Sequence, residues 1–130
     1  MIIINDELLD EVSDKAIESS RLRMNYNFHK SKDSKAQRLL NALEPGTILP
    51  VHRHRNTSET YILLRGSLNV ILYSDKREVI KTIELNQKAG VFGVDIPVNQ
   101  WHTIEVLEPG TIIFEVKDGP YMPISDEDVL

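Results

Sequence analysis

Short apolar or alternating runs, separated by turn-forming residues at nearly even intervals, constrain the fold of this chain most strongly. The runs cover residues 60–64, 68–73, 79–85, 91–94, 102–107 and 111–116. Glycine, proline, serine and asparagine are concentrated between them. Many short strands with frequent turns are typical of an antiparallel sandwich or barrel. We therefore predict an all-β fold for most of the chain.

The N-terminal third is expected to contribute a helix and two strands. Residues 6–20 carry apolar side chains at helical spacing, and residues 22–28 alternate between apolar and polar, which is the period of a strand. Residues 35–43 fit either a short helix or a strand. We predict a strand, because they run directly into Pro45 and Gly46, which suit the centre of a type II turn.

One hexapeptide, Leu-Glu-Pro-Gly-Thr-Ile, occurs twice, at residues 43–48 and 107–112. Both copies place proline before glycine, which favours a turn in which the glycine takes a positive φ. We therefore predict two hairpins with the same turn chemistry.

The length of 130 residues suits a single domain with one core. We divide it into an N-terminal helical segment (1–21), a β-barrel (22–124) and an acidic tail (125–130) that we expect to be mobile. The net charge of −5 argues against nucleic acid or an anionic membrane as the main partner, since both need clustered Lys and Arg.

Cysteine is absent, so any metal site must use histidine, carboxylate and water. The apolar residues 1–4 are followed at once by acidic ones, and the run is too short for a secretion signal. No run approaches the roughly 20 apolar residues of a membrane span. We expect a cytoplasmic protein.

His52, His54, Glu59 and His102 form a candidate metal site. His52 and His54 are two residues apart, so on the strand that we expect there both side chains leave the same face. Glu59 begins an alternating run and lies on the same face as apolar side chains of that run. His102 does the same in its own run. All four are therefore predicted to face the interior.

A buried carboxylate beside buried imidazoles is costly unless a cation neutralises it. We predict one divalent metal ion per chain, with coordination positions left for water or a ligand. The donor set suits Zn, Fe(II), Mn, Ni or Co and does not choose among them.

The spacing around these residues resembles the first cupin motif. Gly46, His52, His54, Glu59 and Gly66 match its fixed positions. The second motif is matched more loosely, because one extra residue separates its glycine from its proline, and two of its positions hold other residues. The residues concerned are Gly90, Pro97, Asn99, His102 and Val106.

Within the cupins, the chain resembles the WbuC-type metalloproteins most, through runs at 23–29 and 115–121, the His52 motif and Trp101-His102. The resemblance implies a cupin-like double-stranded β-helix, or jelly-roll barrel, with a short N-terminal helix. It also implies a bound metal, a saccharide-related small-molecule ligand and a role in bacterial surface-polysaccharide biosynthesis. Cupins commonly pair, and exposed strand edges favour pairing, so we expect a homodimer.

Arg23, Asn25, Asn27 and His29 form a polar stripe on one alternating strand. The stripe is either a solvated outer face or part of a lid strand that binds hydroxyl or phosphate groups. In the second case the first three bind substrate and His29 is an acid or base near the metal.

Tyr61 and Arg65 share the parity of Glu59 and so can face the cavity, Tyr61 as a proton donor or acceptor and Arg65 as a substrate ligand. Core packing for Tyr61 and solvent for Arg65 are the alternatives. Glu115 and Lys117 are interpreted as an exposed ion pair, which contributes little to stability.

Three functions follow from this site. The first is an isomerase or epimerase acting on a sugar or sugar nucleotide, in which His29 or Tyr61 moves a proton. The second is an Fe(II)-dependent dioxygenase. The third is a non-catalytic protein that binds a small ligand through the metal.

Overall fold

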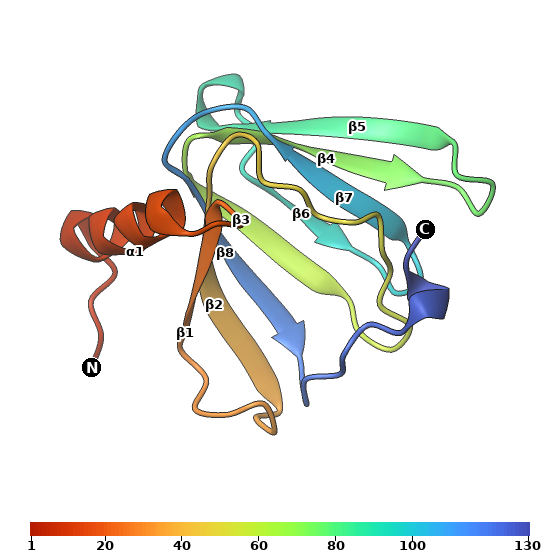
Figure 1. Cartoon of the computed structure of the whole chain (residues 1–130), viewed down its shortest axis with the longest axis horizontal. Coiled ribbons are helices and arrows are strands. Elements are labelled where there is room, and N and C mark those ends of the chain that lie inside the picture. Colours follow the sequence, from red (N-terminus) through yellow and green to blue (C-terminus); the bar gives the residue numbers. More distant parts are fainter.

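A computed structural model describes residues 1–130 and shows two antiparallel β-sheets with one α-helix at the N-terminal end (Figure 1). The elements are α1 (Asp6–Glu18), β1 (Arg23–Asn27), β2 (Ala36–Leu43), β3 (Glu59–Arg65), β4 (Ser67–Tyr73), β5 (Val79–Asn86), β6 (Gly93–Ile96), β7 (Trp101–Val106) and β8 (Thr111–Asp118), with short 3₁₀ turns at Gln87–Ala89 and Asp126–Asp128. The predicted all-β fold with an N-terminal helix is confirmed. Residues 35–43 form the predicted strand.

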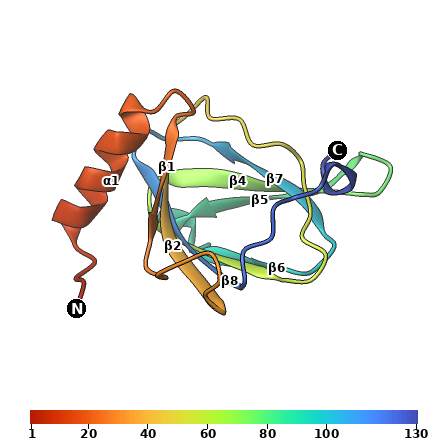
Figure 2. The same cartoon turned by 60° about the horizontal axis from the view of Figure 1, so that its bottom comes forward.

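The two sheets face each other and enclose the main core (Figure 2). One sheet has the strand order β1-β2-β8-β3-β6, and the other has the order β5-β4-β7. Buried side chains from both sheets meet between them. They include Leu43, Leu63 and Ile113 from the first sheet and Leu68, Val70 and Ile104 from the second.

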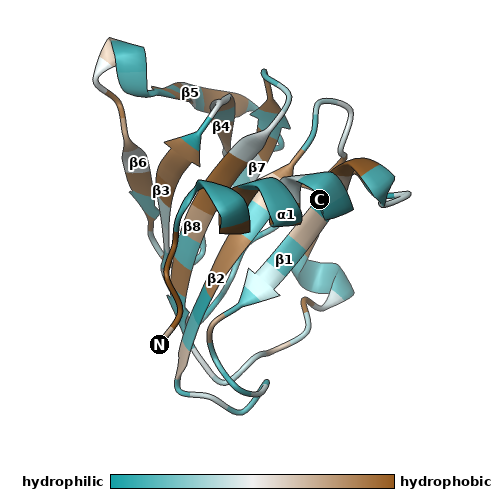
Figure 3. Ribbon diagram, turned by 90° about the vertical axis from the view of Figure 1, so that its left-hand side faces the viewer, coloured by the Kyte–Doolittle hydropathy of each residue, from teal (hydrophilic) through white to brown (hydrophobic).

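Helix α1 covers the outer face of the larger sheet beside β1 and β2 (Figure 1). Asn5 caps it, because the Leu8 amide donates a hydrogen bond to the Asn5 side-chain oxygen at 3.0 Å. Val12 and Ala16 on its inner face pack with Leu40 and other buried residues of β2 and β8. In Figure 3 the side of α1 turned away from the sheet is largely hydrophilic. Neither α1 nor the 3₁₀ turns have the length and apolar content needed to cross a membrane.

The repeated hexapeptide forms two turns, but neither closes a hairpin. Gly46 and Gly110 both take a positive φ, of 95° and 73°. After Gly46 the chain runs without regular structure to Glu59, and after Gly110 it passes from the β5-β4-β7 sheet to the other one. The hairpin prediction is therefore wrong. Local sequence sets the turn conformation, whereas the partner that buries each strand sets the pairing.

The C-terminal residues are held against the rest of the chain. The Arg53 amide donates to the Asp128 carbonyl oxygen at 3.0 Å, and the Leu130 amide donates to the Val51 carbonyl oxygen at 2.8 Å. Asp128 is buried. The tail that we expected to be mobile is therefore packed as part of the domain.

The packing of α1 on the larger sheet can be tested with neighbouring residues on adjacent strands. Leu40, Phe114 and Ile62 lie side by side on its outer face, where Leu40 is fully buried and Ile62 is 42% exposed. We expect Leu40→Ala to lower the free energy of unfolding by about 2–5 kcal/mol, because it leaves a cavity under the helix. The control Ile62→Ala should cost less, about 1 kcal/mol, since much of that side chain is already exposed to water. Urea unfolding measures both, and equal losses would contradict the described helix packing.

Candidate metal centre

His52, His54, Glu59 and His102 come together in the structure as predicted. Their potential ligand atoms all lie within 4.8 Å of one another. They come from three parts of the chain: the irregular segment 44–58, the first residue of β3, and β7. Glu59 and His102 are 4% and 1% exposed, so the group lies at the inner side of the barrel wall.

The segment that carries His52 and His54 is not a regular strand, contrary to expectation. It is held in part by an antiparallel bridge in which the His52 and His102 amides donate to each other's carbonyl oxygens, at 3.0 and 2.9 Å. The ring centroids of these two histidines are 4.4 Å apart. The bridge keeps the extended geometry that turns His52 toward His102.

Backbone contacts determine which ring nitrogens face the centre of the group. The Nδ1 atom of His52 lies 2.9 Å from the Pro50 carbonyl oxygen, and that of His102 lies 2.8 Å from the Gln100 carbonyl oxygen. A carbonyl only accepts, so both Nδ1 atoms carry a proton and the Nε2 atoms are the ones turned toward the group. Burial, followed by the nearby His102, lowers the pKa of His52 to about 4. His52 is therefore neutral near pH 7 and able to bind a metal.

Glu59 is the one anion of the group. Its Oε1 lies 2.5 Å from His54 Nε2, its Oε2 lies 3.5 Å from His102 Nε2, and the Tyr61 hydroxyl donates to Oε2 at 2.6 Å. Burial opposes ionisation, but the contacts with His102, His54 and Tyr61 outweigh it and hold the pKa of Glu59 well below its usual range. Glu59 is therefore a carboxylate.

This arrangement fits a divalent cation. The Nε2 atoms of His54 and His102 are buried without a hydrogen-bond partner. The Glu59 carboxylate that faces these atoms is balanced either by a proton on an imidazole or by a cation between them. Three imidazoles and one carboxylate are donors that Zn, Mn, Fe(II), Co and Ni accept, so the donor set leaves the identity of the metal open.

Glu115 and Lys117 face the interior, contrary to their interpretation as an exposed pair. In the sheet register Glu115 lies opposite Tyr61, and Lys117 lies opposite Glu59. The Asn41 side-chain amide donates to Glu115 Oε1 at 2.9 Å. Burial, with the Glu59 carboxylate adding to it, raises the pKa of Glu115 to about 7. Glu115 is two residues after the buried Ile113, so strand alternation already indicated in the sequence that Glu115 faces the interior.

The polar stripe lies on the same side of the large sheet as the interior residues. Arg23 lies opposite the core residue Leu43, Asn25 lies opposite Asn41, and Asn27 shares their parity. Asn25 and Asn27 are exposed. The Arg23 guanidinium donates to the Thr47 hydroxyl at 3.3 Å and to the Ile48 carbonyl oxygen at 3.1 Å.

Two of the candidate residues lie away from the metal group. His29 accepts a hydrogen bond from the Arg38 amide at 3.1 Å, at the end of the edge strand β1. Arg65 donates to Asp6 and Asp10 of α1, at 2.5 and 2.7 Å. A β-bulge between Leu63 and Arg65 shifts the alternation, so Arg65 emerges on the helix side of the sheet.

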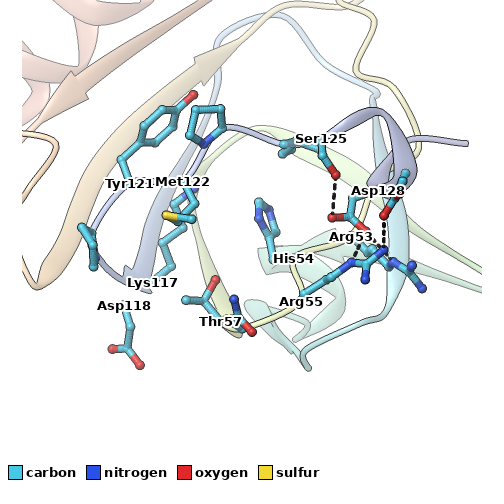
Figure 4. Close-up of a pocket in the computed structure, with 15 residues that line it drawn as sticks. Arg53, His54, Arg55, Thr57, Lys117, Asp118, Tyr121, Met122, Ser125 and Asp128 are labelled. Atoms are coloured by element: carbon cyan, nitrogen blue, oxygen red, sulfur yellow. Dashed lines mark hydrogen bonds and ion pairs between the residues drawn. The ribbon is translucent and has the colours of Figure 1, made fainter.

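A cavity of about 350 Å³ adjoins the metal group (Figure 4). His54 and Lys117 line it, and in Figure 4 His54 points into the space that the C-terminal segment encloses. Tyr121, Met122 and Ser125 form the opposite wall. This volume lies at the small end of the roughly 300–1,000 Å³ that is typical of ligand pockets.

Comparison with protein families gives one match. The model described as "Domain of unknown function (DUF6016)" matches residues 4–85. No curated protein sequence matches the chain.

Several solved structures with a similar fold are cupins. KdgF from Halomonas sp. superposes with a TM-score of 0.60 at 14% identity, over 77% of this chain and 82% of that one. The Cnp3 cupin domain of Schizosaccharomyces pombe gives 0.59 at 11% identity, over 74% of this chain and 64% of that one. The capsular polysaccharide assembling protein CapF from Staphylococcus aureus gives 0.55 at 23% identity, and the match spans 77% of this chain but only 28% of CapF. The predicted cupin jelly-roll fold is confirmed.

The raised pKa of Glu115 should be visible in the pH dependence of stability of the metal-free protein. A carboxyl whose folded pKa is raised contributes stability that is complete below about pH 4.5 and is lost as the pH rises through about 7. Replacement of Glu115 by glutamine removes this loss. We therefore compare the free energy of unfolding of Glu115→Gln with that of the wild type. We expect this difference to be about 2 kcal/mol more favourable to the variant at pH 8 than at pH 4.

Urea unfolding in the presence of EDTA, from pH 4 to pH 8, measures this difference. Glu108→Gln is the matched control, because Glu108 is exposed on the β7–β8 turn and its replacement should leave the pH profile unchanged. Parallel profiles for the wild type and Glu115→Gln would contradict the raised pKa of Glu115.

Proposed function

The chain belongs to the DUF6016 family, and from the site in its cupin barrel we propose that it binds one divalent metal ion and a small saccharide ligand beside it. The observation that carries this proposal is the pair of buried Nε2 atoms, of His54 and His102, that face the Glu59 carboxylate without a hydrogen-bond partner. His52 completes the donor set. A bound divalent ion would satisfy all four residues.

The cavity beside His54 supports a polar, hydroxyl-rich ligand. Asn56, Thr57 and Ser125 line it with amide and hydroxyl groups, and Lys117 adds an ammonium group. The amide and hydroxyl groups both donate and accept hydrogen bonds, and the ammonium group donates, which suits a sugar or sugar nucleotide. The likeness to CapF, a capsular polysaccharide assembling protein, and the resemblance to WbuC-type cupins favour the same ligand class. We therefore propose a role in bacterial surface-polysaccharide biosynthesis.

Isomerisation or epimerisation of that ligand is the chemistry that the side chains support best. The metal, when bound, polarises a carbonyl or hydroxyl oxygen. Glu115 has the near-neutral pKa that suits a proton acceptor at physiological pH. Tyr61 holds Glu59 and stays protonated, since burial and the Glu59 charge raise its pKa. Glu115 thus takes the role that the sequence had suggested for His29.

The pairing of two chains is part of the proposal. The edge strands β1 and β6 of the larger sheet leave unpaired backbone groups that a second copy can pair with.

Metal binding can be measured directly. Titration of the EDTA-treated protein with Zn²⁺, Mn²⁺, Fe²⁺, Co²⁺ and Ni²⁺ should show one site per chain for at least one ion. At a free metal concentration of about 100 times Kd, the free energy of unfolding should rise by about 2.7 kcal/mol. His102→Ala should abolish this gain, whereas His29→Ala should keep it. A wild-type protein that none of these ions stabilises would refute the metal site.

The ligand class needs a separate screen. Sugars and sugar nucleotides are mixed with the metal-loaded protein, and NMR detects any isomer of equal mass. Isomers formed by the wild type and lost in His54→Ala and Glu115→Gln support the isomerase. Ligand-dependent melting without turnover identifies the non-catalytic binding protein, and oxygen consumption by the Fe(II) form identifies the dioxygenase. No response to any saccharide would refute the saccharide assignment.

A further inference from the structure

Arg53 connects the segments that carry the metal ligands. It lies between His52 and His54 in the sequence, and its guanidinium stacks on Trp101, with the guanidinium carbon 4.4 Å from the ring centroid. Trp101 precedes the ligand His102 and is itself fixed by its Nε1–H, which donates to Asp75 at 2.9 Å. Arg53 therefore links the irregular ligand segment to strand β7.

The C-terminal segment completes this link. Asp128 accepts a hydrogen bond from Arg53 Nε at 2.9 Å and another from Arg55 Nε at 2.7 Å. Charge-assisted contacts of this kind are stronger than ordinary hydrogen bonds. The Asp128 side chain is only 13% exposed, so its contact with Arg53 is partly shielded from water.

Backbone pairing supports the same connection. His52 forms one antiparallel bridge with His102 and a second one with Val129. The backbone at His52 is therefore paired on both sides, with β7 on one side and the C-terminal segment on the other. The segment 44–58 belongs to neither sheet, so these bridges supply much of the backbone pairing around the two histidines.

We propose that Arg53, Trp101 and Asp128 form a clamp that positions His52, His54 and His102, so that residues 125–130 are part of the metal site. The inference rests on the metal binding proposed above. To order a residue of an irregular segment costs conformational entropy. When the clamp has already ordered the ligands, that cost does not reduce the metal affinity.

The test compares two neighbouring acidic residues in the full-length protein. Asp128→Asn weakens the contacts with Arg53 and Arg55. Glu127→Gln is the matched control, since Glu127 is 81% exposed and contacts only Arg55 Nη2, at 3.2 Å. The metal that binds the wild type most tightly is titrated into each metal-free protein against a competing chelator. We expect Asp128→Asn to weaken binding by roughly tenfold or more, and Glu127→Gln to stay within about twofold of the wild type.

Melting of the metal-free and metal-loaded forms separates positioning from general stability. A clamp predicts that Asp128→Asn reduces the gain in Tm on metal addition. A merely structural contact lowers both melting temperatures equally and leaves Kd unchanged, which would overturn the proposal. Arg53→Lys provides a second variant should Asp128→Asn fail to fold, because it keeps the charge but loses the planar contact with Trp101; unchanged Kd there would also overturn it.

Failure of the clamp differs from failure of the metal site. A wild type that binds metal with the same Kd as Asp128→Asn refutes the clamp alone. A wild type that binds no metal refutes the proposed function and the clamp together.

Discussion

The burial of the Glu59 carboxylate is the constraint on which the rest of the site depends. An anion that is 4% exposed is tolerated only where donors and positive charge surround it. Tyr61 supplies one hydrogen bond, and Lys117 Nζ lies 3.8 Å from Oε1. The remaining neighbours, the imidazoles of His54 and His102, balance the carboxylate either by carrying a proton or by holding a cation together with it. The fold therefore has to bring three separate parts of the chain to the start of β3.

The parts of the site that the sequence predicted are those that depend on local alternation. The two-residue period of a strand assigns Glu59 and Tyr61 to one face whatever the partner strands are. The same argument places His102 with Ile104, and the helical period defines the buried face of α1. The face of Arg65 was not predicted correctly, because a bulge interrupts the alternation after Leu63. The bulge depends on the pairing with β8.

Features that depend on the neighbouring strand were harder to predict. Glu115 and Lys117 lie on β8, which the structure places between β2 and β3 in the middle of the larger sheet. Parity assigns these residues to the face of Ile113, but how deeply that face is buried depends on the position of β8 in the sheet, which no local pattern gives. The clamp around Arg53 is of the same kind, since Asp128 lies 75 residues away in the sequence.

The barrel changes from apolar to polar along its strands, and this explains why the candidate site lies at one end. Along β8 the interior residues run from Ile113 to Glu115 and Lys117, and along the antiparallel β3 they run from Leu63 back to Glu59. Charges gather where the cavity and the C-terminal segment meet the barrel, while buried aliphatic residues fill the other end. Ionised groups need water or a cation, so only the open end can hold them. Close packing of the apolar end makes the barrel rigid. The ligands at the opposite end therefore keep the positions that a metal ion requires.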